Sequence, residues 1–272
     1  MPINDKFEKS ITNIEIDGMK IRYASIGLGR PLFMLHGWGG DLHSWKPLAE
    51  CLSTSKYQIF SLDMPGFGES MAPKKAWYIT DYSAFFEKFV QKIYTKYGLK
   101  GEYNVVAHSF GGRLILKLFE ESANQISIPS KLVLIASAGI KHPFSFQKRA
   151  LQGIAKFGAS IFSLPLLRGF KAAARKLMYK ILRVHDYERT SGVMRKTFLN
   201  IIGDDLIGCL EQINCPALIV WGTDDTYVPV SDAHLMHDKI SNSKLKIIKG
   251  GRHGIHKTHA KEIGGWIDEF LK

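Results

Sequence analysis

Cysteines and long apolar runs are scarce in this sequence, and acidic residues are fewer than basic ones. The three cysteines, Cys51, Cys209 and Cys215, form neither a CxxC pair nor an even framework, which indicates reduced thiols in a cytoplasmic protein. The longest uncharged run, residues 212–223, is too short to cross a bilayer, so no transmembrane segment is expected. Residues 1–6 lack the basic start and apolar core of a signal peptide.

The excess of basic residues is concentrated in one part of the chain. Lysine and arginine total 37 against 25 acids, a formal net charge of +12. Residues 141–200 hold seven lysines and six arginines against Asp186 and Glu188, a charge of +11, and the remainder is close to neutral. The overall composition, 45% hydrophobic and 23% charged, is typical of a soluble globular protein. It excludes a disordered, coiled-coil or collagen-like chain.

Short apolar runs alternate with helical patterns along most of the chain. Residues 11–17 and 19–26 alternate apolar and polar side chains and meet at Asp17-Gly18, which predicts a β-hairpin. Six later runs predict buried strands: Pro31–Leu35, Tyr57–Leu62, Tyr103–Ala107, Lys131–Ala136, Ala217–Trp221 and Leu245–Ile248. Helical spacing fits Ser44–Leu52, Thr80–Tyr97, Gly112–Glu121, Ser231–Ile240 and Thr258–Leu271. This order predicts an α/β protein with a mostly parallel, eight-stranded sheet and helices on both faces.

The alternation of strands and helices stops between residues 141 and 208, where the pattern is helical. We therefore expect an α/β core made of residues 1–140 and 209–272, with residues 141–208 inserted as a helical cap. Such a cap would cover the carboxyl ends of the strands, where open α/β sheets bind their ligands.

The strongest chemical signal is Ala107-His108-Ser109-Phe110-Gly111-Gly112, which follows a predicted strand and opens a predicted helix. It fits the nucleophile-elbow pattern, with alanine in place of the first glycine. A tight turn there lifts the hydroxyl of Ser109 clear of the backbone, and small neighbours let the turn close. The N-terminus of the helix favours negative charge at the reacting centre.

A serine nucleophile needs a base and an acid that orients the base, and both residue types follow the last two predicted strands. Asp224 and Asp225 come after the strand that ends at Trp221, and His253 follows the final strand. The glycine-rich segment of residues 36–40 follows an earlier strand, and its backbone amides could face an oxyanion.

Five motifs together resemble the α/β-hydrolase superfamily, and most closely its cap-bearing esterases and lipases. In chain order they are His36-Gly37-Trp38-Gly39, Asp63-Met64-Pro65-Gly66-Phe67-Gly68-Glu69-Ser70, Ala107 to Gly112, Trp221-Gly222-Thr223-Asp224-Asp225 and Gly250-Gly251-Arg252-His253-Gly254. The resemblance covers residues 11–271 and is weakest in the cap. It implies the α/β-hydrolase fold and a serine carboxylesterase-like activity that needs no cofactor.

The resemblance also implies a role for each matching residue. Ser109 corresponds to the nucleophile and His253 to the general base. Asp225 corresponds to the acid, the fifth residue of the family's Trp-Gly-x-x-Asp pattern, with Asp224 as the alternative. The oxyanion donors would be two backbone amides, those of Trp38 and Phe110. The substrate would be a small-molecule ester with an apolar acyl or aromatic group, cleaved through an acyl-enzyme intermediate.

Departures from other patterns of this superfamily narrow the chemistry. A serine at position 109 argues against epoxide hydrolases and haloalkane dehalogenases, which use a carboxylate nucleophile. Gly254 follows His253, where C–C bond hydrolases usually carry tryptophan. Ester hydrolysis is therefore favoured. Hydrolysis of a C–C, lactone or thioester bond, and acyl transfer, are alternatives for the same triad, and a ligand receptor with vestigial hydrolysis is a third class.

Structural roles are expected for the other polar residues near these motifs. We expect His36 to brace the glycine-rich loop and Asp63 to anchor its own turn. His108 is expected to pack in the interior, and His256 and His259 are expected on the surface. The histidine spacings fit no zinc signature, and the glycines of residues 27–30 are not followed by a helix. Neither a metal nor a nucleotide cofactor is therefore expected.

The basic residues of the cap are mixed with apolar ones at helical spacing between Lys148 and Arg195. The apolar side chains would seat the cap on the core, leaving the charges on a solvated outer face. Alternatively, an apolar underside would hold the acyl group while the charges attract an anionic surface weakly. No nucleic-acid recognition motif accompanies the charge, so nucleic acid is not an expected partner.

Overall fold

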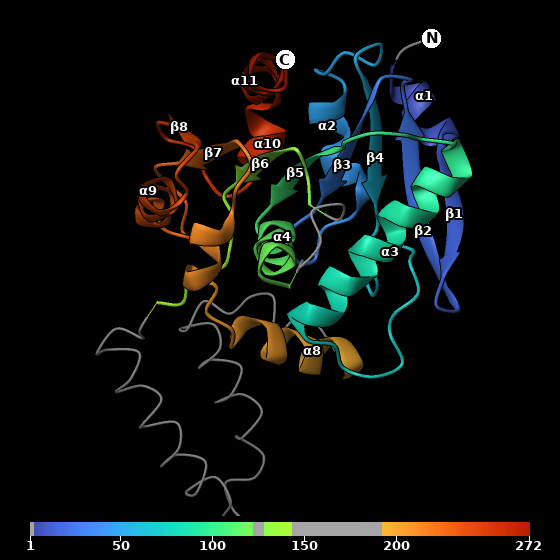
Figure 1. Ribbon diagram of the computed structural model, residues 1–272, viewed down its shortest axis with the longest axis horizontal. Helices are drawn as coiled ribbons and strands as arrows, with labels where there is room; N and C mark the ends of the chain where they lie inside the picture. The colour runs from blue at the N-terminus through green and yellow to red at the C-terminus, as the bar shows by residue number, and fades with distance from the viewer. Residues whose placement is uncertain (1–2, 122–127, 143–191) are drawn as a thin grey trace, which may run out of the picture.

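The computed structural model of the protein describes residues 3–121, 128–142 and 192–272 (Figure 1). Within these residues, eight strands form one sheet in the order β1-β2-β4-β3-β5-β6-β7-β8. The strands are β1 (Ile11–Ile16), β2 (Met19–Ile26), β3 (Arg30–Leu35), β4 (Tyr57–Leu62), β5 (Asn104–His108), β6 (Lys131–Ile135), β7 (Ala217–Gly222) and β8 (Ser243–Ile248). β2 pairs antiparallel with β1 and β4, and all other pairs are parallel. The predicted mostly parallel sheet is confirmed.

The opening hairpin of β1 and β2 turns at Asp17 and Gly18. Both residues have positive φ, 50° and 74°, as a two-residue type I′ turn requires. The turn brings Ile16 opposite Met19 and thereby sets the register of the whole hairpin.

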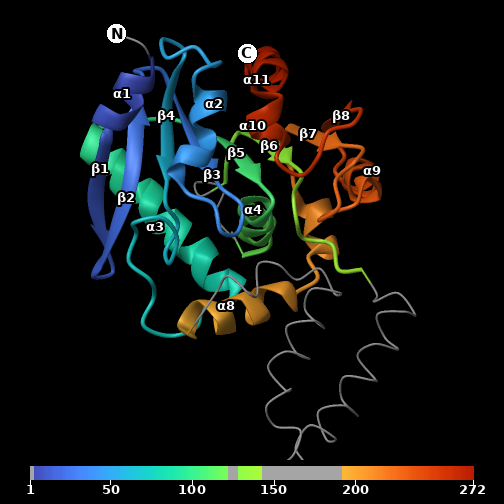
Figure 2. The same ribbon diagram turned by 180° about the vertical axis from the view of Figure 1, so that it is seen from behind.

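Helices cover both faces of the sheet (Figures 1 and 2). They are α1 (Ile3–Lys9), η1 (Leu42–Trp45), α2 (Lys46–Ala49), α3 (Ile79–Tyr97), α4 (Phe110–Glu121), α8 (Gly192–Ile202), η4 (Ile207–Gln212), α9 (Val230–Lys239), α10 (Ile255–Thr258) and α11 (Ala260–Phe270). Successive strand residues point to opposite faces, so Phe33 and Leu35 join one apolar core with α3, α4 and α9. Leu32 and Met34 join a second core with α2, α10 and α11. Because the parallel strands are buried on both faces, their sequences are continuous apolar runs.

Two of the predicted helices have a different form in the structure. The region predicted as one helix, Ser44–Leu52, begins earlier as a 3₁₀ turn, because Asp41 and Ser44 form a reciprocal cap around residue 42. The predicted helix Thr258–Leu271 is two helices, α10 and α11, which meet at His259, a residue with φ of −122°. The short N-terminal helix α1 was not expected from the sequence.

The predicted cap, residues 141–208, lies mostly outside the described residues, since 143–191 are not described. Its described part contains α8, which contacts two loops at the carboxyl ends of the strands. Phe198 packs on Trp38 with ring centroids 5.0 Å apart, and Thr197 Oγ1 accepts the N–H of Trp77 at 3.0 Å. Within the described residues, Figures 1 and 2 show α8 at the end opposite to α1 and α11. In the described part of the chain, no helix is both long enough and apolar enough to cross a membrane.

Candidate active site

Ser109 lies at the sharp turn between β5 and α4. Its φ of 51° is in the left-handed region, which a residue with a side chain rarely adopts. Hydrogen bonds hold this strained conformation, since the N–H of Ser109 donates to the carbonyl of Ile135 at 3.2 Å. Its own carbonyl accepts from Arg113 at 3.1 Å and from Ala138 at 3.0 Å. The turn predicted from the sequence pattern is therefore formed and is fixed by the neighbouring strand β6.

The two glycines after Phe110 let α4 approach the sheet closely. A Cβ atom on Gly111 would lie 2.3 Å from the carbonyl oxygen of Leu35 in β3, and one on Gly112 would lie 2.1 Å from Ser137 Oγ. Real contacts are never this short, so any side chain would push the helix off the sheet. Ala107, at the first glycine position of the motif, is fully buried in the core.

Ser109, His253 and Asp225 form one continuous hydrogen-bonded line. His253 Nε2 lies 3.0 Å from Ser109 Oγ, and His253 Nδ1 lies 2.7 Å from Asp225 Oδ2. The Asp225 side chain is fully buried, and its other oxygen accepts the N–H groups of Tyr227 at 2.8 Å and Val228 at 3.0 Å. With Nδ1–H donated to the carboxylate, Nε2 is free to accept the serine proton.

The alternative acid, Asp224, lies apart from this line. It is exposed to solvent, and its carboxylate accepts a hydrogen bond from Thr223 Oγ1 at 2.7 Å. Its backbone N–H donates to the carbonyl of Gly251 at 2.9 Å and so joins the loop after β7 to the loop after β8. The two loops touch closely enough that a Cβ on Gly222 would lie 2.1 Å from the Gly251 oxygen.

The imidazole of His36 fixes the orientation of one peptide group in the glycine-rich loop. Its Nε2 accepts the N–H of Met64 at 3.0 Å, so the ring proton is on Nδ1, which donates to the carbonyl of Gly37 at 2.8 Å. Burial lowers the pKa of His36, which favours this neutral form. The Gly37 carbonyl and the Trp38 N–H belong to one planar peptide, so holding the carbonyl also aims the N–H. The expected bracing role of His36 is confirmed.

Trp38 and Phe110, the two residues expected to supply oxyanion amides, contact each other through their rings, whose centroids are 5.3 Å apart. Phe110 is the first residue of α4, and the N–H groups of a first helical turn have no acceptor within the helix. The ring of Trp38 also contacts Phe67 at 4.8 Å and Phe198 at 5.0 Å. An aromatic cluster therefore surrounds the backbone next to Ser109.

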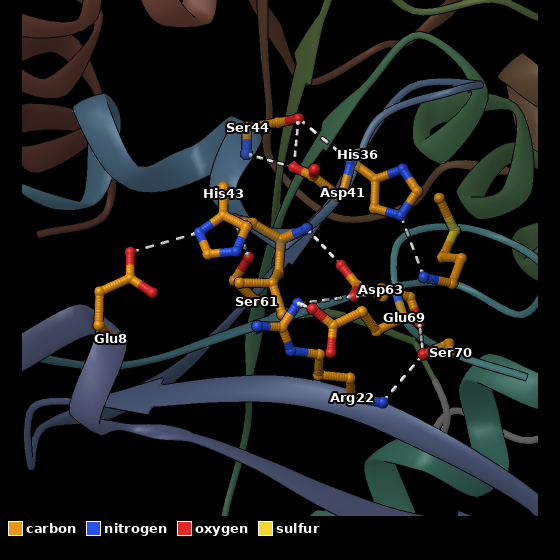
Figure 3. A network of polar contacts seen from close by, with 12 residues as sticks. Glu8, Arg22, His36, Asp41, His43, Ser44, Ser61, Asp63, Glu69 and Ser70 are labelled. Atoms are coloured by element: carbon orange, nitrogen blue, oxygen red, sulfur yellow. Dashed lines mark hydrogen bonds and ion pairs between the residues drawn. The ribbon is translucent and has the colours of Figure 1, made fainter.

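Asp63 joins the loop after β3 to the loop after β4 (Figure 3). It is completely buried, and its carboxylate accepts the N–H groups of Leu42 at 2.6 Å and Glu69 at 2.9 Å. Arg22 Nη1 lies 3.8 Å from the same carboxylate and 2.7 Å from that of Glu69, while Ser70 Oγ donates to the Asp63 carbonyl at 2.6 Å. Asp63 holds its own turn, as expected, and it also fixes the start of η1.

A pair of buried histidines lies beneath the proposed triad. His108 Nε2 is 2.9 Å from the carbonyl oxygen of His253, which agrees with the packing role expected for it. The expected surface position of His256 is wrong. This residue is 3% exposed because α10 turns it inward, where its ring lies 4.0 Å from that of His108 and 5.1 Å from that of Trp45.

We expect the free energy of unfolding to decrease between about pH 7 and about pH 5 because of these histidines. Burial, with a smaller contribution from the charges of Lys257 and His253, lowers the pKa of His256 to about 3. The unfolded chain takes up this proton near pH 6.5, whereas the folded protein does not, so acid favours unfolding. For His256 alone the loss is about 2 kcal/mol over this range. Urea unfolding of wild type and His256→Phe at both pH values measures it, and an equally steep pH dependence in the variant would contradict the assignment.

Across the described ranges, no group of three or more His, Cys, Asp or Glu residues is arranged to hold a metal ion. Cys51, Cys209 and Cys215 are free thiols.

A family model described as the alpha/beta hydrolase fold matches residues 30–260. The chain belongs to this alpha/beta hydrolase family. It is 27% identical to a pimeloyl-[acyl-carrier protein] methyl ester esterase of Legionella pneumophila, over 93% of this chain and 100% of that protein. It is 26% identical to the dihydrolipoyllysine-residue acetyltransferase component of an acetoin cleaving system from Pseudomonas putida, over 95% of this chain and 68% of that protein.

The fold also matches that of solved structures. An esterase from Exiguobacterium antarcticum superposes with a TM-score of 0.71 over 96% of this chain and 98% of that one, at 22% identity. At this identity the likeness supports the fold alone.

One residue of this site was not indicated by any sequence motif. The ring of Tyr227 stacks on the imidazole of His253, with centroids 4.9 Å apart and planes inclined by 23°. The only signal in the sequence was its place two residues after Asp225, which predicts nearness to the acid but not contact with the histidine.

Proposed function

We propose that the protein hydrolyses carboxylic esters through a catalytic triad of Ser109, His253 and Asp225. The observation that carries the proposal is the hydrogen-bonded line from Ser109 Oγ to His253 at 3.0 Å and on to Asp225 at 2.7 Å. The left-handed φ of Ser109 supports it, because such strain persists only where the surrounding structure imposes it and is common at active sites.

Each group has a defined task in the first half of the reaction. His253 takes the proton of Ser109 as its oxygen attacks the ester carbonyl, and the buried Asp225 stabilises the imidazolium. The amides of Trp38 and Phe110 hold the negative oxygen of the tetrahedral intermediate, and α4 begins at this point. His253 then gives its proton to the leaving alcohol, and an acyl group stays on Ser109.

Water completes the reaction by the same route in reverse. His253 removes a proton from the water, the acid is released and Ser109 is restored without any cofactor. Lactone, thioester and C–C hydrolysis are alternatives for the same residues, and acyl transfer would follow if an alcohol replaced the water. The methyl ester esterase among the relatives favours the ester as substrate.

An apolar acyl group fits the surroundings of Ser109. The ring of Trp38 packs against Phe67, Phe110 and Phe198, and Phe67 also packs against Phe110, beside the backbone that follows Ser109. We also propose that residues 141–208 form a cap domain over this site, on a core made of residues 1–140 and 209–272. The contact of Phe198 in α8 with Trp38 supports that arrangement.

A series of p-nitrophenyl esters of increasing acyl length tests this function. We expect turnover to increase with acyl length as long as each added CH₂ group gains apolar contact, and to fall beyond a medium length. Matched thioester and lactone substrates, and an added alcohol that competes with water, measure the alternatives in the same assay. Faster turnover of a thioester or a C–C substrate than of every ester would contradict the ester assignment.

A further inference from the structure

The aromatic ring of Tyr227 covers part of the proposed catalytic base. Its centroid lies 4.9 Å from that of the His253 imidazole, at an angle of 23° that is close to parallel. A hydrogen bond fixes the backbone of Tyr227, because its N–H donates to Asp225 Oδ1 at 2.8 Å. The same carboxylate holds His253. The backbone of Tyr227 therefore has a fixed place beside the acid, and its ring stacks on the base from there. Its outer part is in solvent, since Tyr227 is 55% exposed.

The face of an aromatic ring attracts a cation through its quadrupole, and the attraction is effective within about 6 Å of the centroid. In the proposed reaction, the imidazole of His253 becomes a cation while the tetrahedral intermediate exists. A ring held against it in advance stabilises that state without any reorganisation during the reaction.

We propose that Tyr227 is a positioning residue that stabilises the imidazolium form of His253 with its ring face. The inference deepens the proposed function and rests on it for its role in catalysis. The stacking contact concerns the ring alone, so phenylalanine replaces tyrosine in this role and an aliphatic side chain does not.

Other groups also face His253. Asp225 binds Nδ1, Ser109 binds Nε2, and the ring of His108 lies 4.8 Å away. His256, in α10, interacts with His253 electrostatically, since the charge of His253 helps to lower the pKa of His256, as does that of the adjacent Lys257. All of these groups are the same in variants at position 227. A comparison between such variants therefore isolates the ring.

The experiment is an NMR titration of the His253 imidazole nitrogens in wild type, Tyr227→Phe and Tyr227→Leu, with His253→Gln to identify the resonances. Leucine still covers the imidazole from water but has no aromatic face. We expect Tyr227→Phe to keep the wild-type titration midpoint and Tyr227→Leu to lower it by about 0.4 to 0.7 pH unit. In parallel, kcat for ester hydrolysis falls about two- to fivefold in Tyr227→Leu, with KM unchanged.

Each other outcome overturns the inference. Equal midpoints in all three proteins would show that the ring does not interact with the cation, and a shift in Tyr227→Phe would assign the effect to the hydroxyl group. A rise in KM with an unmoved midpoint would mean that Tyr227 contacts the substrate instead. The titration requires no turnover. If the protein does not hydrolyse esters, the proposed function is refuted, and the titration still decides whether the ring of Tyr227 stabilises the imidazolium. Since Tyr227 is exposed, all variants are expected to fold, and circular dichroism verifies this.

Discussion

Substitution of Ser109 by alanine is expected to lower kcat for ester hydrolysis by about a million-fold. The hydroxyl is the group whose oxygen His253 activates for attack on the substrate, and its loss leaves His253 with nothing to activate except water. The measurement is steady-state hydrolysis of the best p-nitrophenyl ester by the purified variant.

Ser55→Ala is the matched control for this substitution. Ser55 is an exposed serine just before β4, its hydroxyl lies 2.9 Å from that of Ser53, and its loss should leave kcat unchanged. Circular dichroism and the Tm of Ser109→Ala verify that the elbow still folds. A Ser109→Ala protein within tenfold of wild type would show that another residue performs the reaction.

Asp225→Asn is expected to reduce kcat by about ten-thousand-fold. The N–H groups of Tyr227 and Val228 require an acceptor at Oδ1, so the carbonyl oxygen of the new amide takes that position. Its NH₂ group then faces His253 Nδ1 and forces that nitrogen to accept a hydrogen bond. The ring proton moves to Nε2, which can no longer take the proton of Ser109.

The neighbouring substitution Asp224→Asn provides the control. The Asp224 side chain is exposed and contacts Thr223, so its amide should change kcat less than threefold. Kinetics of both variants on one ester decide between the two carboxylates. A large loss in Asp224→Asn together with normal turnover in Asp225→Asn would reverse the assignment of the acid.

Most of the sheet could be predicted because its central strands are buried on both faces. The run Lys131–Ala136, for example, became β6 within one residue of its predicted end. β8 was harder, since its burial alternates and Lys244 and Lys246 carry charge outwards, as is common on an edge strand. Its predicted start at Leu245 was two residues late.

Some features of the proposed site could be predicted from the sequence and others could not. The motifs indicated the candidate site residues in the loops after β3, β5, β7 and β8. Each motif lies within a single loop, and its glycines and small residues determine the backbone conformation of that loop. Contacts between loops leave no such pattern. His256 was expected on the surface, although it lies against His108, and the stacking of Tyr227 on His253 joins residues from two different loops.

The central claim of this account is that an acyl group bonds covalently to Ser109 during turnover. The most direct measurement is the mass of the protein after acid quenching early in the hydrolysis of a p-nitrophenyl ester, followed by peptide mapping. The account predicts a population heavier by one acyl group, with the added mass on the peptide that contains Ser109, and no such population in Ser109→Ala. Turnover without any acylated protein, or an acyl group on another residue, would contradict it.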